Sequence, residues 1–413
     1  MIYTRISCCR ICGSGELSTI LNLGVQSLTG VFPPSSAPEV EAGPLELTMC
    51  GECHLVQLAH NYELSLLYGD TYGYRSGLNS SMVDHLRAKI DAIIHRVSLA
   101  TDDTVLDIGS NDGTTLGAYP QRSLQFVGMD PTGEKFRKYY KPDIHLVPDF
   151  FSASAFTKAV GAKKAKIVTS IAMFYDLESP KDFAKQVASI LDDEGIWVFE
   201  QSYLPSMINT LAYDTVCHEH LEYYCLFQIQ NILKDAGLRI LDVEFNTANG
   251  GSFSVTAVHM KSPLKSDETK IASILKNEEQ GGYLKMDLYR TFEKNVKIHG
   301  KSLKEKLIEI RNEGGRIHGY GASTKGNVIL QFCGIGKNDL EVIAEVNEEK
   351  YGRVTPGTNI PITSEEESRA KNPTHYLVLP WHFRAGIIKR EAGFLETGGK
   401  LLFPLPRIEI VQR

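Results

Sequence analysis

The stretch from Ala212 to Tyr224, "AYDTVCHEHLEYY", places two histidines, two glutamates and three tyrosines within thirteen residues. Imidazole and carboxylate groups this close together suit proton transfer, because histidine takes up a proton readily and a neighbouring carboxylate can orient it. Two other interpretations stay open. His218 and His220 could ligate a metal ion, which would need further ligands that the sequence does not identify, or the segment could be a solvated, aromatic-rich surface.

Five of the eight cysteines lie within the first 53 residues, which calls for a local explanation. Cys9 and Cys12 form one C-x-x-C pair, Cys50 and Cys53 form a second, and 37 residues separate the pairs. Four thiolates on two such turns suit tetrahedral zinc and leave no open coordination position, so the ion would be structural. A redox-active or incidental pair of cysteines is the alternative.

A glycine-rich turn follows the apolar run at residues 104–108, and a helix start follows the turn. The turn lacks the G-x-G-x-x-G spacing of dinucleotide sites, and its D-x-G-x-N-x-G layout favours a nucleoside that carries methionine. Seventeen residues after Gly113, a second strand-like run ends at Asp130, where an acid can accept two hydrogen bonds from a ribose. The turn residues are Asp107, Gly109, Asn111 and Gly113.

The elements that must position these groups alternate between strand-like and helix-like stretches, which predicts a doubly wound parallel sheet. Ligands of such sheets bind at the carboxyl ends of the strands. Asp149, Phe150, Ser170 and Glu200 fall at such ends, and the histidine-rich stretch follows soon after Glu200. "NGGSFSVTAVHM" reads as an alternating strand that closes an antiparallel edge.

The last third of the chain repeats the α/β pattern on a smaller scale. Residues 261–312 are charged and helix-forming, and "GRIHGYGASTKGNVIL" then reads as a strand, a small-residue turn and a helix. The turn is not a Walker A loop, because Lys325 is followed by glycine rather than serine or threonine. Amides at the helix start, with Ser323, Thr324 and Lys325, could hold phosphates, and a simple tight turn is the alternative.

The composition restricts the class of protein and its partners. A chain of 413 residues is long enough for two or three domains, and 42% hydrophobic residues with 23% charged residues are typical of a globular protein. The net charge of -6 argues against a nucleic-acid partner, which usually leaves a basic imprint. No apolar run reaches the length of a membrane span. We therefore expect a cytoplasmic protein, and a monomer is plausible because the second sheet already covers the first.

The order of the motifs resembles that of bacterial C-methyltransferases of deoxysugar biosynthesis that depend on S-adenosyl-L-methionine (SAM) and begin with a zinc-binding domain. The resemblance extends over nearly the whole chain, through "CRICG", "CGECHLVQL", "YGYRSGLNSSM", "VLDIGSNDGTTL", "CHEHLEYY" and "GYGASTKGN". It implies an α/β fold with a class I SAM methyltransferase core that is Rossmann-like. The implied domains are a zinc-binding module (1–70), the core (71–260), a helical connector (261–312) and a C-terminal Rossmann-like α/β domain (313–413).

The resemblance also implies a reaction and its cofactors. SAM would methylate a dTDP- or GDP-linked 4-keto-6-deoxy sugar, at C-3′ in most relatives, and Zn²⁺ would be structural. The ketone acidifies the neighbouring C–H bond, so the enzyme needs a base and a group that stabilises the enolate. His220 is the expected base, His218 is the alternative, and Glu219 and Glu222 would orient or polarise the base. Cys217 stands where some relatives have a tyrosine.

The remaining roles are assigned by the same resemblance. Donors to the enolate oxygen would come from Tyr223, Tyr224, Tyr72 and Tyr74. SAM would be held by Asp107, Gly109, Asn111, Asp112, Gly113, Asp130, Asp149, Phe150 and Ser170. The sugar nucleotide would contact Tyr72, Tyr74, Glu222, Tyr320, Ser323, Thr324, Lys325 and Asn327.

Two rival functions come from other classes. A zinc-containing methyltransferase acting on RNA or protein would be expected to have a basic groove, which the net charge does not favour. A non-enzymatic sensor of SAM or of a sugar nucleotide would leave the histidine–glutamate cluster without a role. Proton chemistry on a sugar nucleotide accounts for the cluster and for both glycine-containing turns.

Overall fold

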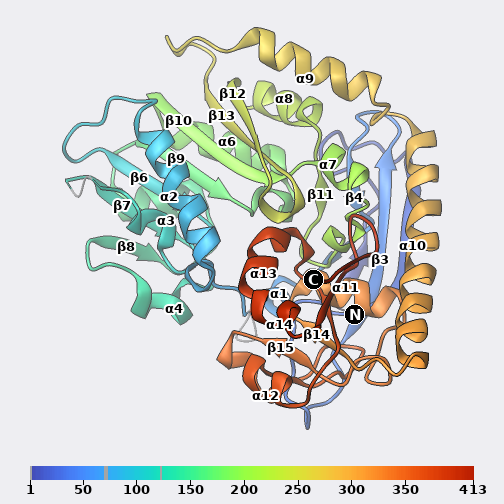
Figure 1. Cartoon of the computed structure of the whole chain (residues 1–413). Helices are drawn as coiled ribbons and strands as arrows, with labels where there is room; N and C mark the ends of the chain where they lie inside the picture. Colours follow the sequence, from blue (N-terminus) through green and yellow to red (C-terminus); the bar gives the residue numbers. More distant parts are fainter. Residues whose placement is uncertain (1, 69–72, 121–122) are drawn as a thin grey trace.

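The computed structural model describes residues 2–68, 73–120 and 123–413, and its strands form sheets of seven, six and four strands and a two-stranded ribbon (Figure 1). The largest sheet forms the core of the methyltransferase part. In spatial order its strands are β12 (Leu238–Asn246), β13 (Ser252–His259), β10 (Leu191–Ser202), β9 (Ala165–Ile171), β6 (Thr104–Ile108), β7 (Gln125–Met129) and β8 (Ile144–Val147). The five strands from β10 to β8 are parallel, which confirms the predicted class I core.

Helices cover both faces of this sheet, as the sequence pattern of strand β6 requires. Every residue of β6 is buried, and successive side chains of a strand point to opposite faces. Val105 packs with helix α2 (Ser80–Ile94), whereas Leu106 packs with α6 (Pro180–Ile190) and α8 (Leu226–Asp235). A strand buried on both faces is typical of a parallel sheet between two helical layers.

The prediction that the "NGGSFSVTAVHM" strand closes an edge of this sheet is wrong. Strand β13 lies between β10 and β12 and pairs antiparallel with both, so β12 is the edge. All of β13 except His259 is buried, because its serines and threonines face covered surfaces rather than solvent. An alternation of apolar and small polar residues does not distinguish those two situations.

The N-terminal part forms a four-stranded sheet that takes one strand from the middle of the chain. Its order is β11 (Glu222–Tyr223), β4 (Val56–Leu58), β3 (Ala42–Cys50) and β2 (Leu17–Ser27), all antiparallel. The ribbon pairs β1 (Tyr3–Arg5) with β5 (His60–Tyr62). The predicted connector is helical, with α9 (Glu268–Gln280) and α10 (Met286–Asn312), and α10 runs beside the N-terminal sheet (Figure 1).

The C-terminal sheet confirms the predicted second Rossmann-like unit. Its order is β16 (Ile362–Ser364), β15 (Ile343–Glu345), β14 (Ile317–Tyr320), β17 (His375–Val378), β18 (Lys400–Phe403) and β19 (Glu409–Val411). All pairs are parallel except the last. The chain order reverses between β14 and β17, which is where such sheets bind ligands. The main helices of this part are α11 (Thr324–Phe332), α12 (Glu365–Ala370), α13 (Arg384–Arg390) and α14 (Ala392–Glu396).

Within the described ranges, no helix combines the length and the apolar character that a membrane crossing requires. The longest helix, α10, is amphipathic instead. Its buried positions include Phe292, Val296, Leu303 and Leu307, which recur at helical spacing and join one core cluster with the N-terminal and C-terminal sheets. The apolar stripe of α10 therefore connects the two outer parts of the chain.

We expect Trp197→Ala to destabilise the core sheet strongly. The indole of Trp197 is fully buried against Phe174 and Phe199, with ring centroids at 5.5 and 4.4 Å. Removing a buried tryptophan costs about 3–5 kcal/mol of unfolding free energy, measurable by urea denaturation followed by circular dichroism. Met260→Ala is the matched control, because that side chain is 55% exposed. An equal loss in both variants would contradict this description of the core.

Candidate functional site

A cavity of about 420 Å³ opens at the carboxyl ends of β6, β7 and β9, where a class I core binds its cofactor. The turn after β6 forms one wall. Gly109 and Gly113 have φ angles of +74° and +76°, which side chains rarely adopt. A Cβ at Gly113 would also lie 3.0 Å from the ring of Tyr140. The turn therefore requires glycine at these positions. The walls include Gly109, Asn111, Asp130, Phe150 and Asp176.

Asp130 and Asp107 hold the turn in shape from two sides. Asp130 lines the cavity and accepts hydrogen bonds from the amide of Asn111 at 2.8 Å and of Thr132 at 2.7 Å. Asp107 lies beneath the turn, where the hydroxyl of Thr169 donates to it at 2.5 Å. Burial raises the pKa of the Asp107 carboxyl to about 7. Asp107 is absent from the cavity wall, so its contribution is to the turn.

The side chains of Asn111 and Asp112 bind the segment that precedes helix α2. Asn111 Oδ1 accepts from the amide of Ser76 at 2.9 Å, and its Nδ2 donates to the carbonyl of Tyr74 at 3.2 Å. Asp112 Oδ2 accepts from the amide of Gly77 at 2.9 Å. The cofactor turn thus holds residues 74–77 in place. Sequence reasoning missed this link, because nothing local in "GSNDG" indicates a partner thirty-five residues earlier.

Of the nine predicted SAM residues, Gly109, Asn111, Asp130 and Phe150 line the cavity; Asp107, Asp112 and Gly113 belong to the turn without lining it, and Asp149 and Ser170 lie elsewhere. Ser170 is buried, and its hydroxyl accepts a hydrogen bond from the indole nitrogen of Trp197 at 3.1 Å, so it belongs to the core. Asp149 is exposed, and its carboxylate accepts from the amide of Phe150 at 2.8 Å. Phe150 itself lines the cavity and is 47% exposed, so its ring is available to a ligand.

A second cavity, of about 660 Å³, lies where the three parts of the chain meet. Gly30 and Phe32 come from the N-terminal part, and residues 73–81 come from the core. The opposite wall is formed by the ends of β14, β15 and β17, at the point where the strand order reverses. Tyr74 lines both cavities, so the two spaces share a wall. Tyr72, the other tyrosine predicted for this segment, lies outside the described residues.

Glu219 lies on the wall of the larger cavity. Its Oε2 atom is buried without a hydrogen-bond partner, and burial raises the pKa of the carboxyl. A Cβ at Gly30 would clash with Glu219 Oε1, so a larger residue there would displace the Glu219 carboxyl from its present position. The hydroxyl of Thr324 lies near the same point, 3.7 Å from that Cβ position. Residues from all three parts of the chain thus converge on the Glu219 carboxyl.

His220 is half-buried directly behind this wall and lines neither cavity. Its Nδ1 lies 2.8 Å from the carbonyl oxygen of Thr215, which can only accept, so Nδ1 holds the proton and Nε2 has the lone pair. The ring packs on Tyr175 with centroids 4.3 Å apart. Burial, reinforced by the Lys325 ammonium, lowers the pKa of His220 to about 3. The imidazole is therefore neutral and able to accept a proton at neutral pH.

The other predicted members of the cluster lie away from both cavities. His218 is fully buried, 3.3 Å from the hydroxyl of Thr29, and its ring packs on Tyr62 at 4.8 Å. Glu222 is buried 3.7 Å from Arg10 Nε. Tyr224 is buried against Phe174, and its hydroxyl has no hydrogen-bond partner. The structure does not bring these three side chains to a ligand-sized space.

The residues predicted to bind the sugar nucleotide divide into wall residues and supports. Tyr320, Ser323 and Thr324 line the larger cavity. Lys325 Nζ donates to the carbonyl of Asn249 at 2.9 Å. Asn327 is buried and donates to the carbonyl of Thr29 at 2.7 Å, so it connects α11 with the N-terminal part.

Sequence reasoning missed several residues of this wall. Glu345 ends strand β15 and accepts from the amide of Ala322 at 2.7 Å, in the position that Asp130 takes in the core sheet. Asp130 follows the second strand of the core sheet in chain order, and Glu345 ends the second strand of the C-terminal sheet. Comparing the two α/β units could therefore have identified Glu345. His382 follows β17 in "PWHF", and its Nδ1 is buried without a partner. The cationic wall residues Arg75, Lys350 and Arg390 come from three separate segments.

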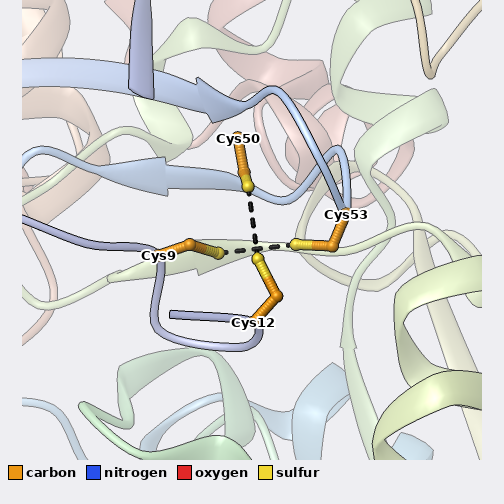
Figure 2. A group of neighbouring side chains, drawn as sticks. All are labelled: Cys9, Cys12, Cys50 and Cys53. Carbon is orange, nitrogen blue, oxygen red and sulfur yellow. Dashed lines mark hydrogen bonds between the residues drawn. The ribbon is translucent and has the colours of Figure 1, made fainter. Parts of the chain in front are cut away.

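Figure 2 shows the sulfur atoms of the four N-terminal cysteines pointing toward one another. The four Sγ atoms lie within 4.8 Å of one another, with Cys9–Cys53 and Cys12–Cys50 both at 3.4 Å. Tetrahedral zinc with four thiolates needs sulfur separations of about 3.8 Å, given Zn–S bonds of about 2.3 Å. The arrangement therefore fits a structural zinc ion held by Cys9, Cys12, Cys50 and Cys53.

Three family models match successive parts of the chain. They are described as "Putative zinc binding domain" at residues 9–68, "Methyltransferase domain" at 82–243 and "C-methyltransferase C-terminal domain" at 247–406. The C-methyltransferase NovU of Streptomyces niveus is 28% identical over 419 residues, covering 99% of this chain and 98% of that protein.

Solved structures resemble about two fifths of the chain at low similarity. A SAM-dependent methyltransferase of Clostridium acetobutylicum has a TM-score of 0.32 and 14% identity, covering 42% of this chain and 90% of its own. The magnesium protoporphyrin IX methyltransferase of Synechocystis has a TM-score of 0.32 and 15% identity, covering 43% of this chain and 82% of its own.

We expect the purified protein to hold one zinc ion per chain, and Cys12→Ser to lose it. Removing one of four thiolates weakens a structural site whose binding energy is also folding energy, so the melting temperature falls by about 5 °C or more. Elemental analysis and a thermal melt measure both effects. Cys8→Ser is the control, because Cys8 is exposed and outside the cluster. Equal zinc loss in both variants, or no zinc in the parent protein, would contradict the assignment.

Proposed function

The chain belongs to the SAM-dependent C-methyltransferases built from a zinc-binding domain, a methyltransferase domain and a C-terminal domain, and we propose that its acceptor is a nucleotide-linked 4-keto-6-deoxy sugar. The observation that supports this proposal best is the pair of cavities that share Tyr74 as a wall. One has the position and the turn of a SAM site. The other, at about 660 Å³, is within the range of small-molecule sites.

The nucleotide end of the acceptor lies against the C-terminal sheet in this proposal. The larger cavity opens where the strand order reverses between β14 and β17, and the start of helix α11 faces it with Ser323 and Thr324. Helix starts favour phosphate groups because their free amides point toward the ligand. Arg75, Lys350 and Arg390 supply positive charge on the same walls, beside the carboxyl groups of Glu219, Glu345 and Glu365, the last of which is paired with Arg390. A diphosphate fits this combination.

The sugar end lies toward Glu219 and Tyr74, beside the SAM cavity. Bound SAM would supply an electrophilic methyl group, with Gly109 and Asn111 against its methionine part, Asp130 at the ribose and Phe150 at the adenine. His220 Nε2 takes the proton next to the ketone, while Thr215 holds the opposite ring nitrogen and so fixes the tautomer. Glu219 orients the sugar at the wall. The enolate carbon then attacks the methyl group, and the ketone is restored.

A test of this function is mass spectrometry after incubation with SAM and dTDP- or GDP-linked 4-keto-6-deoxyhexose in deuterated water. We expect the sugar to gain one methyl group, and His220→Asn to lower both methylation and solvent-deuterium uptake by about 10²-fold or more, the usual contribution of a general base. His218→Asn is the matched control two residues away, because its ring faces Tyr62 instead. No methylation with either acceptor would reject the proposal, and equal loss in both variants would reject His220 as the base.

The pH dependence of deuterium uptake tests the state of the base. The pKa of His220 is lowered to about 3, so the neutral imidazole persists as pH falls and the uptake rate stays level between pH 8 and 5.5. An unperturbed histidine, with a pKa of about 6.5, would instead lose roughly tenfold in its neutral fraction at pH 5.5. Initial rates across this range distinguish the two cases, and a tenfold decline would contradict the buried, neutral base.

A further inference from the structure

Lys325 connects residues of the two cavities without lining either of them. Its ammonium donates to the carbonyl of Asn249 at 2.9 Å, and Asn249 lines the SAM cavity. Thr324, the preceding residue, lines the acceptor cavity. One hydrogen bond and one peptide bond therefore connect Lys325 to a wall residue of each cavity.

The charge of Lys325 is only partly compensated. Among the described residues Lys325 forms no ion pair, and its ammonium donates a hydrogen bond to the neutral carbonyl of Asn249. Asp214 is the carboxylate whose charge acts on it, at longer range, and Asp214 Oδ2 already accepts from the Trp381 indole at 2.7 Å. A partly buried cation with a distant counter-ion attracts any negative charge that develops nearby.

The field of Lys325 reaches the groups around the expected reaction centre. Burial lowers the pKa of both His220 and His382, and the Lys325 ammonium lowers each further. Around the His220 ring, Cys217 and Glu219 flank the same segment, Tyr175 packs on its face, and Lys325 approaches from α11. Positive charge at this point opposes protonation of His220 but favours an anion beside it.

Other residues are available to bind the diphosphate, which is the other role that Lys325 could have. The diphosphate has Arg75, Lys350 and Arg390 on the cavity walls, whereas Lys325 is not part of either wall. Among the predicted donors to the enolate, Tyr224 is buried against Phe174 and the hydroxyl of Tyr223 bonds the Thr215 carbonyl at 3.3 Å. Tyr74, which lines both cavities, remains an uncharged donor on the wall, so Lys325 would add a positive charge that no tyrosine supplies.

We propose that Lys325 stabilises the enolate that forms at the sugar ketone, rather than binding the phosphates of the nucleotide. This inference rests on the proposed function. When His220 takes the proton, the C–H electron pair forms the new C=C bond and the carbonyl π pair moves to the oxygen, where the charge of the Lys325 ammonium would favour it. On methyl transfer that pair restores the C=O bond, the C=C pair forms the new C–C bond, and the S–CH₃ pair remains on sulfur. The proton then leaves His220 for solvent.

The experiment compares Lys325→Met, which removes the charge, with Lys325→Arg, which keeps it. Deuterium uptake at saturating dTDP- or GDP-linked 4-keto-6-deoxyhexose, measured without SAM, reports enolate formation alone. We expect Lys325→Met to lower its rate by about 10²–10³-fold, as for removal of one group that stabilises an oxyanion, and Lys325→Arg to recover part of the loss. Affinity for free dTDP or GDP, measured by calorimetry, should stay within a factor of two in both variants.

A second readout needs no substrate. Imidazole NMR of the free protein, with the His220 signal identified from His220→Asn, should show the pKa of His220 rising in Lys325→Met, because a repelling positive charge is gone. Weaker nucleoside-diphosphate binding with unchanged uptake at saturation would overturn the inference in favour of a phosphate ligand. Unchanged uptake, binding and pKa would overturn it as well. Inactivity of the parent protein on both acceptors would instead reject the proposed function.

Discussion

The segment from Ala212 to Tyr224, which carries the proposed base, is fixed in space by its attachment to the zinc-binding module. Strand β11 is the edge strand of the module's sheet, and the amide of Leu58 donates to the carbonyl of Leu221 at 2.8 Å. Arg10, between two of the zinc ligands, donates to the carbonyls of Leu58 and Leu221 at 2.7 and 3.4 Å. The zinc site of the four cysteines therefore sets the position of Leu221, the residue next to His220. The zinc site itself lies outside both cavities.

The buried pair of Arg10 and Glu222 contributes more to specificity than to stability. Both side chains are almost fully removed from solvent, and the Nε–Oε1 separation of 3.7 Å is too long for a strong hydrogen bond. Burial raises the pKa of Glu222, and the Arg10 charge opposes that rise. A pair in this setting costs desolvation energy that its attraction only partly offsets. Arg10 Nε and both carboxylate oxygens of Glu222 are buried without a hydrogen-bond partner, so the pair favours its register between β11 and β4 only by bringing opposite charges together.

Local pattern predicted the parts of the site that local chemistry determines. The paired cysteines, the glycine turn and Asp130 are each defined by neighbours within a few residues, because backbone conformation and ligand type restrict them there. The local sequence does not show that the rings of His218 and His220 have different surroundings. The fold separates them: the ring of His218 packs on Tyr62 in the zinc-binding module, whereas the ring of His220 packs on Tyr175 in the core. That choice depends on contacts across the chain, which no short window contains.

The same reasoning explains why the link between Tyr74, a predicted substrate contact, and the glycine turn escaped prediction. Tyr74 is oriented by Asn111, whose side chain bonds the Tyr74 carbonyl and the Ser76 amide on one side while its own amide donates to Asp130 on the other. The turn that would bind SAM is thus continuous with a wall of the acceptor cavity. Methyl transfer requires donor and acceptor atoms aligned at about 3–3.5 Å. A shift of the turn would move both binding surfaces together, so their alignment depends on three hydrogen bonds of one asparagine.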